Sequence, residues 1–292
     1  MAKWLKTTDF IIFEVRDRVA YVTLNRPEKR NAMNQQLSQE VHDALREADD
    51  LKSVHCVVLQ GAGKDFSAGM DLASIASSLE DEDTSAYRGR PGTFDDEYWH
   101  LRLAADRRVE AFKMAKPVIA KIHGNCLAGA TDIALQCDIL IAATDARIGF
   151  PATRAIGSPP THMWLYHVGP QWAKRLLFTG DVIRGSEAAE IGLVMKAVPP
   201  EQLDAEVEAL AQRIALVAPD LLAAHKRIVN LGLELMGALT LQRLAAENDA
   251  RAHLSAGYRE FFANVSEHGV REAVRLRDEP FGSIEATRGP EA

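Results

Sequence analysis

Cysteine is scarce in this chain of 292 residues, which has only Cys56, Cys126 and Cys137. All three lie among apolar residues, and none belongs to a C-x-x-C pair or to a Cys/His spacing typical of zinc sites. We therefore expect buried, reduced thiols, with neither a disulfide framework nor a metal site.

Long apolar runs are also missing. A membrane-spanning helix needs a stretch of about 18 apolar residues, and no such stretch occurs. Residues 1–6 lack the apolar segment and the small-residue cleavage site of a secretory signal. The sequence therefore predicts a cytoplasmic protein with no membrane association.

Positive charge is not in excess, because 34 Lys and Arg stand against 41 Asp and Glu, for a net charge of −7. Proteins that bind nucleic acid gain much of their affinity from clustered Lys and Arg, so we expect no nucleic-acid partner. A local basic patch for a small anionic ligand remains compatible with this balance. What is abundant is apolar residues, 47% of the chain, which is ample material for a globular core.

Apolar periodicity predicts alternating strands and helices up to about residue 200 and helices beyond it. Residues 10–15 and 19–24 read as a hairpin, and Asn34 is a possible cap for a helix over 35–48. The acidic, Ser- and Gly-containing stretch 78–97 is typical of an exposed loop. The further predicted strands are 54–60, 117–123 and 139–143, and the further predicted helices are 98–114, 171–178, 186–191, 201–217, 223–235 and 239–264. We divide the chain into an α/β core, residues 1–200, and a helical C-terminal region, residues 201–292.

Three segments combine glycine with polar residues at the ends of apolar strands, where backbone amides can meet a ligand. They are residues 25–33 (NRPEKRNAM), 64–72 (KDFSAGMDL) and 123–138 (HGNCLAGATDIALQCD). Taken in this order, the three segments resemble the enoyl-CoA hydratase/isomerase (crotonase) superfamily. The stretch from Thr179 to Val194 is similar to the same family's T-G…A-x-E-A…G-L-V pattern.

The resemblance implies a crotonase-like spiral of ββα repeats with a C-terminal helical region that covers the pocket and mediates trimerisation. It further implies a homotrimer or a dimer of trimers, and an acyl-CoA substrate whose coenzyme A is part of the substrate. No metal and no permanently bound cofactor is implied.

Carried over residue by residue, the resemblance places an oxyanion hole at the backbone amides of Ala68 and Gly129. Enolisation of a thioester moves negative charge onto its carbonyl oxygen, and two preplaced N–H donors stabilise that charge without reorganisation. Small residues suit both places, because a bulky side chain would hold the carbonyl away. Tight packing of a helix on a sheet is the alternative explanation for these small residues.

A further set of residues is implied to line the coenzyme A and acyl path. Lys29 and Arg30 would lie near its phosphates, although a solvated loop explains them equally well. Asp71 has the alternative role of a helix cap. The complete set is Glu28, Lys29, Arg30, Ala32, Ser67, Gly69, Met70, Asp71, Leu72, Leu127 and Ala152.

The pattern departs from that of a hydratase, because family members use two glutamates to add water across a double bond. The first falls on Asp132, and the second falls on Ala152 or, with a one-residue shift, on Thr153. No Asp or Glu occurs between Asp145 and Asp181, so no small shift restores the second acid.

Asp132 could act as a lone acid or base with a raised pKa, or be a helix-start carboxylate without a chemical role. His162, Arg154 and Tyr166 follow the missing acid and could move a proton in its place, and His162 is the candidate we name as catalytic. Hydration of a 2-enoyl-CoA is the nominal activity that follows from the resemblance. The alternatives are an acid-poor isomerase, decarboxylase or thioester or C–C hydrolase, or a non-catalytic binder of CoA thioesters.

Overall fold

The computed structural model describes residues 2–80, 88 and 92–282. Its first element is the predicted hairpin, in which β1 (Ile11–Arg16) pairs antiparallel with β2 (Val19–Leu24). Asp17 and Arg18 make the tight turn with positive φ values of 46° and 69°. The hairpin prediction is thus confirmed.

Six strands form the main sheet in the order β1-β2-β3-β4-β6-β9. All neighbours after the hairpin are parallel. Every residue of β2 is buried, as expected for a strand in a sheet whose two faces are both covered by other elements. The remaining strands of this sheet are β3 (Cys56–Gly61), β4 (Val118–Ile122), β6 (Ile139–Ala143) and β9 (Lys196–Val198).

A second, three-stranded sheet has the order β5-β7-β8. Its strands are β5 (Asn125–Leu127), β7 (Arg147–Gly149) and β8 (Val182–Arg184). Single bridges connect Ser67 to Cys126 and Met33 to Met70, so the three glycine-containing segments of the sequence are joined at one place.

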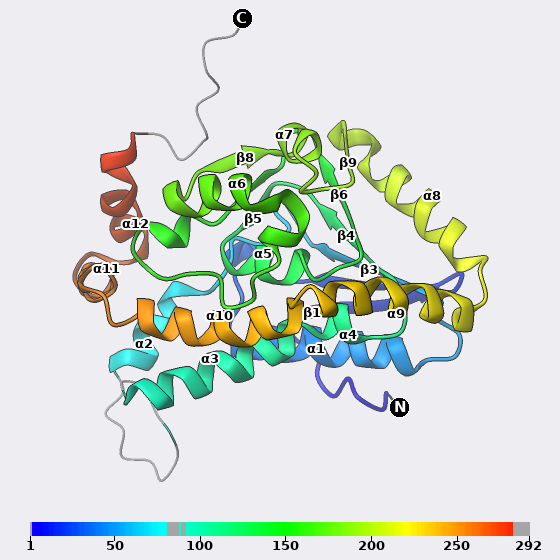
Figure 1. Ribbon diagram of the computed structural model, residues 1–292, viewed down its shortest axis with the longest axis horizontal. Helices are drawn as coiled ribbons and strands as arrows, with labels where there is room; N and C mark the ends of the chain where they lie inside the picture. The colour runs from blue at the N-terminus through cyan, green and yellow to red at the C-terminus, as the bar shows by residue number, and fades with distance from the viewer. Residues whose placement is uncertain (1, 81–87, 89–91, 283–292) are drawn as a thin grey trace, which may run out of the picture.

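Helices cover both sheets and make up nearly all of the chain beyond β9 (Figure 1). The N-cap predicted for α1 is confirmed, because the side chain of Asn34 accepts a hydrogen bond from the Leu37 N–H at 2.8 Å. The helices of the first part are α1 (Gln35–Asp50), α2 (Leu72–Glu80), α3 (Phe94–Arg108), α4 (Glu110–Lys113), α5 (Gly129–Ala134), α6 (Trp164–Thr179) and α7 (Gly185–Glu190). Those of the second part are α8 (Leu203–Ala215), α9 (Pro219–Leu235), α10 (Ala238–Ala252), α11 (Ala256–His268) and α12 (Val270–Asp278). The short 3-10 turns are η1 (Pro27–Lys29), η2 (Pro151–Arg154), η3 (Pro200–Gln202) and η4 (Glu279–Phe281).

Two predicted elements have different bounds in the structure. The single helix expected over 239–264 is wrong, because α10 ends at Ala252 and Ser255 caps a new helix by accepting from the Tyr258 N–H. The loop expected over 78–97 is helical at both ends, since α2 reaches Glu80 and Thr93 starts α3 with a capping box. Residues 81–87 and 89–91 of that loop lie outside the described residues.

The C-terminal helices complete the core and cover one side of it. Helix α8 packs on β3, β4 and β6, and α10 lies along α3, as Figure 1 shows. Helices α11 and α12 pack against each other, and α11 contacts α2. The three cysteines are buried and unpaired, as predicted. Among the described residues, no helix is long and apolar enough to cross a membrane.

Candidate active site

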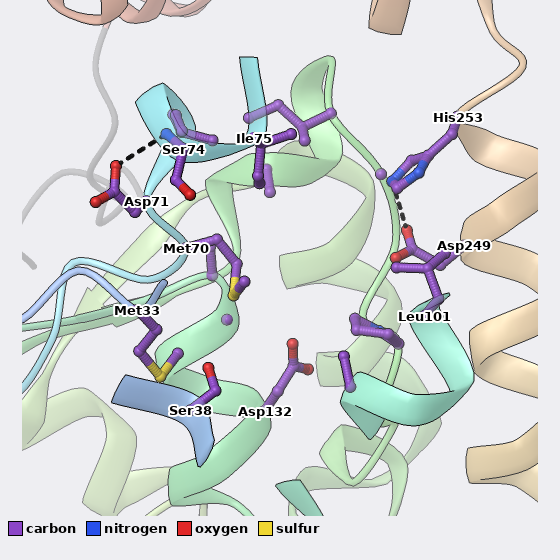
Figure 2. A pocket seen from close by; sticks show the side chains of 18 of the residues that line it. Met33, Ser38, Met70, Asp71, Ser74, Ile75, Leu101, Asp132, Asp249 and His253 are labelled. Atoms are coloured by element: carbon purple, nitrogen blue, oxygen red, sulfur yellow. Dashed lines mark hydrogen bonds and ion pairs between the residues drawn. The ribbon is translucent and has the colours of Figure 1, made fainter. Parts of the chain in front are cut away.

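A cavity of about 1050 Å³ lies where the glycine-containing segments meet the C-terminal helices. Its lining comes from residues 33–35, from the segment 68–78, from α3, from the start of α5, from residues 150–160 and from α10 to α12. Figure 2 shows Met70 and Asp132 on one side of this space and Asp249 and His253 on the other. The cavity therefore joins parts of the chain that are more than 200 residues apart.

The predicted oxyanion donors have different environments. The Ala68 N–H donates to the Arg30 carbonyl oxygen at 2.9 Å, so it is not available to a ligand. The choice of Ala68 as a donor is therefore wrong. Met70, two residues further on, forms a β-bridge with Met33. In this bridge the Met33 N–H donates to the Gly69 carbonyl and the Asp71 N–H donates to the Met33 carbonyl, so the N–H of Met70 itself is unused.

Gly129 is the first residue of α5, so its N–H has no partner within the helix. No acceptor for this amide or for that of Met70 occurs among residues 2–80, 88 and 92–282. A Cβ on Gly69 would lie 3.3 Å from the Gly129 nitrogen, and a Cβ on Gly129 would lie 2.9 Å from Met70 Cγ. Met70 and Gly129 thus bring two unused amides close together, and both residues line the cavity.

Gly69 and Ser67 support this arrangement without lining the cavity. Gly69 has φ 98°, and a Cβ there would collide with the Leu127 carbonyl oxygen, so only glycine allows the close approach. Ser67 is completely buried, accepts from the Gly69 N–H at 3.1 Å and donates to the Asn31 carbonyl at 2.8 Å. Ser67 and Gly69 are not among the residues that line the cavity, so their predicted contact with the substrate stays a prediction.

Asp132 projects from α5 into the cavity and is only 1% exposed (Figure 2). Neither carboxylate oxygen accepts a hydrogen bond from the part of the chain that the structure describes. Burial raises the pKa of Asp132 to about 8, although the guanidinium of Arg108, 3.6 Å away, acts in the opposite direction. A carboxyl with this pKa holds its proton at neutral pH and can donate it.

Arg108 is a member of the site that the sequence analysis missed. It lies at the end of α3, is 5% exposed and lines the cavity. Its Nη2 donates to the Met70 sulfur at 3.2 Å, and its Nε has no hydrogen-bond partner among the described residues. Nothing in the sequence around it distinguishes Arg108 from the other arginines of a surface helix.

The residues expected to replace the second acid lie in different places. Ala152 lines the cavity, as predicted, whereas Thr153 donates to the Leu177 carbonyl. His162 is not among the residues that line the cavity, and its catalytic role stays a prediction. Arg154 forms ion pairs with Asp181 and Asp278, and Tyr166 donates to the Met236 carbonyl; both are structural.

Another buried carboxylate besides Asp132 lines the cavity, and it comes from the C-terminal region. Asp249 of α10 is 5% exposed, and its Oδ1 accepts from the Ser158 N–H at 2.8 Å. His253, one turn further along, places Nε2 3.6 Å from the same oxygen and Nδ1 2.7 Å from Glu97 Oε1. Burial raises the pKa of Asp249 to about 6, and the neighbouring His253 lowers it. Asp249 was not predicted from the sequence as a site residue.

The residues predicted for the coenzyme A path fall into two sets. Asp71 lines the cavity, pairs with Arg26 at 3.2 Å and accepts from the Ser74 N–H at the start of α2, so the cap prediction is confirmed. The other predicted residues that line the cavity are Met70, Leu72, Leu127 and Ala152. Those that do not line it are Glu28, Lys29, Arg30 and Ala32, of which all but Ala32 are exposed.

Comparison with known proteins fixes the family. Residues 14–256 match the family described as enoyl-CoA hydratase/isomerase. The chain belongs to the enoyl-CoA hydratase/isomerase family. Among curated relatives of this family member, the crotonyl-CoA hydratase of Syntrophomonas wolfei is 36% identical over 229 residues, which are 77% of this chain and 82% of that protein. The short-chain-enoyl-CoA hydratase of Clostridium acetobutylicum is 34% identical, with the same two coverages.

Solved structures of other family members confirm the predicted crotonase fold. The chain is similar to an enoyl-CoA hydratase from Mycobacterium smegmatis, with a TM-score of 0.88 at 38% identity over 97% of this chain and 98% of that one. It is also similar to an enoyl-CoA hydratase/isomerase from Xanthobacter autotrophicus Py2, with a TM-score of 0.87 at 34% identity over 95% and 100% of the two chains.

Proposed function

We propose that this family member binds an acyl-CoA thioester and stabilises the enolate of that thioester, with hydration of a 2-enoyl-CoA as its nominal reaction. The observation that carries the proposal is the pair of unused amides at Met70 and Gly129, next to the buried acid Asp132. The named activities of the similar hydratases support it. The proposed enzyme is a lyase, and coenzyme A enters only as part of the substrate.

The chemistry follows from charge development. As a nucleophile adds to the double bond or a proton leaves Cα, the thioester oxygen becomes anionic. N–H donors that are already in place stabilise this anion, and the loss of one such donor costs on the order of 100- to 1000-fold in rate. Met70 and Gly129 supply the donors in our proposal, and Asp132 exchanges a proton with the carbon skeleton.

Hydration is not the only reaction that an enolate permits. Replacement of the second glutamate by Ala152 favours an isomerase, a decarboxylase or a hydrolase if Asp132 acts alone. A panel of enoyl-, malonyl- and β-diketone thioesters in deuterated water separates these activities, because each gives a different product and enolisation exchanges the α-proton. We expect turnover of a 2-enoyl thioester with deuterium at Cα. Tight binding of CoA without turnover or exchange on any substrate would instead indicate a non-catalytic binder.

A substitution tests the role of Asp132 in this reaction. We expect Asp132→Asn to lower turnover by more than tenfold and to leave the affinity for CoA similar, because only the proton-transfer group changes. Steady-state kinetics and calorimetric titration with CoA measure the two quantities. Wild-type turnover in this variant would remove Asp132 from the mechanism.

We also propose that the protein assembles as a homotrimer or a dimer of trimers through its C-terminal region. Helix α9 and the residues just before it expose large apolar side chains, which is typical of a surface that pairs with another subunit. These side chains are Leu216, Leu221, Ile228, Val229 and Leu235. Light scattering after size-exclusion chromatography measures the assembly, and a monomer at micromolar concentration would contradict the proposal.

A further inference from the structure

The cavity holds a carboxylate that the sequence pattern of the family does not assign. Asp249 lies on α10, 117 residues after Asp132, and it faces the cavity that Asp132 enters from α5 (Figure 2). The two groups are close enough for the charge of Asp249 to raise the pKa of Asp132, and the charge of Arg108 acts on both. Asp132, Asp249 and Arg108 are therefore buried charged side chains that lie close to one another at this cavity.

The segment that lacks the second acid is shaped to receive Asp249. Ala152 starts a turn in which its carbonyl accepts from the N–H groups of Ile156 and Gly157. A Cβ on Gly157 would overlap Asp249 Oδ1, and the next N–H, that of Ser158, donates to that oxygen. The backbone that follows Ala152 thus holds the carboxylate of α10 at the wall of the cavity.

We propose that Asp249 is the second acid–base residue of this site, in place of the carboxylate that is missing at Ala152, with His253 and Glu97 as its positioning residues. The inference rests on the proposed hydration of a 2-enoyl thioester. His253 keeps Asp249 in place from one side, and Glu97 on α3 fixes the His253 ring through Nδ1. The ring also stacks on Tyr258 at 4.4 Å between centroids, so its orientation is restrained on two sides.

The two carboxylates have complementary roles. Asp249 receives an N–H hydrogen bond and faces an imidazole, which favours its ionised form, whereas no described group lies in good hydrogen-bond geometry with the Asp132 oxygens, and burial outweighs the effect of the nearby Thr161 on the pKa of Asp132. With pKa values of about 6 and about 8, Asp249 is mostly ionised and Asp132 mostly protonated at pH 7. Environments that separate two carboxyl groups in this way give one base and one acid.

The proposed step conserves atoms and charge. Asp249 takes a proton from water as the water oxygen bonds to Cβ of the 2-enoyl thioester. The electron pair of the Cα–Cβ double bond moves toward the carbonyl, whose oxygen becomes anionic at the amides of Met70 and Gly129. Asp132 then gives its proton to Cα as the enolate collapses. Asp249 ends neutral and Asp132 ionised, and proton exchange with solvent restores both.

Asp249→Asn tests the proposal, with Glu247→Gln on the same helix as the matched control, since Glu247 pairs with Arg251 outside the cavity. With crotonyl-CoA as substrate, we expect Asp249→Asn to lower kcat by roughly 100-fold or more and to change KM less than about threefold. Glu247→Gln should stay within about twofold of wild type. Gly157→Ala, which keeps the carboxylate but displaces it, should lower kcat by roughly 10- to 100-fold.

The pH profile separates a proton-transfer role from a structural one. The charged and titratable groups that face Asp249 are His253 on its own helix, Glu97 and Arg108 on α3, and Asp132 on α5. In the wild type, kcat/KM should fall below about pH 6, and this acidic limb should be absent in Asp249→Asn. Wild-type kcat or a retained acidic limb in Asp249→Asn would overturn the inference and leave the proposed function intact. A wild-type protein that neither binds nor converts any thioester would overturn both.

Discussion

Asp132 should lower the free energy of unfolding of the protein, and the substitution Asp132→Asn measures the size of this effect. Burial raises the pKa of this carboxyl from an ordinary 3.8 to about 8. Between these two values the folded protein holds a proton that the unfolded chain has released. Stability is therefore lost as the pH rises through this window, because the unfolded state is the one that gives up the proton.

The magnitude follows from the distance to the ordinary pKa. At pH 7 the folded Asp132 is still mostly protonated. This pH lies 3.2 units above the ordinary pKa of 3.8, and at 1.36 kcal/mol per unit the unfolded chain gains about 4 kcal/mol by releasing the proton. Asparagine has nearly the same shape and does not ionise, so Asp132→Asn should raise the free energy of unfolding by up to this amount. The charge of Arg108 is equally uncompensated beside a neutral aspartic acid and beside asparagine, so it does not change the comparison.

Urea unfolding at pH 7 and at pH 5 is the assay. At pH 5 the same arithmetic gives about 1.6 kcal/mol, so the gain should shrink by more than half. Glu40→Gln serves as a contrasting variant. The buried Glu40 accepts hydrogen bonds from the Phe10 N–H and the Thr7 hydroxyl, so its substitution should lower the free energy of unfolding. A loss of stability in Asp132→Asn, or a gain that does not depend on pH, would refute the reasoning.

Four further outcomes follow from the same contacts. Gly129→Pro, which removes an amide donor, should lower kcat by on the order of 100- to 1000-fold in steady-state assays. Lys226→Met should lower the unfolding free energy by about 1–3 kcal/mol in urea, because Asp138 and the carbonyls of Ala111 and Lys116 lose the buried ammonium that donates to them. The wild-type pH–rate profile should be bell-shaped, falling below about pH 6 and above about pH 8, and a flat profile between pH 5 and 9 would contradict the two roles. Ala152→Glu in an Asp249→Asn background should recover at least about tenfold in kcat, because it returns a carboxylate to the same cavity.

Much of the fold could be predicted from local pattern. The hairpin and the Asn34 cap depend on residues that lie close in the sequence, since Ile11 pairs with Leu24 and Asn34 accepts from the Leu37 N–H, and alternation and capping chemistry act directly over such distances. The boundary between α10 and α11 was missed, because no proline marks the break and the nearby Gly257 lies inside the first turn of α11, where a glycine does not by itself indicate a helix start.

The site was less predictable, because it depends on which backbone groups are already used. Ala68 and Met70 flank the same glycine in the sequence, and only the bridge to Met33 and the bond to Arg30 decide which amide is left over. Asp249 gave one usable signal. It falls on the buried face of α10, together with Gln242, Ala245, Ala246 and Ala250, and an aspartate on a helix face that the spacing of small and apolar residues marks as buried is rarely there by chance.

The docking of α10 on α3 connects the energetics of the fold to the chemistry of the site. Ala246 and Ala250 are completely buried against Leu101 and Ala105, and these small side chains allow the two helices to approach closely along their length (Figure 1). The same approach sets Asp249 and His253 of α10 opposite Glu97 and Arg108 of α3, and removes them from water. Apolar contact between the helices thus offsets the cost of burying acids whose raised pKa values the proposed reaction uses. Since neither helix supplies a complete acid–base pair alone, the second proton-transfer group exists only while the C-terminal region stays docked on the core.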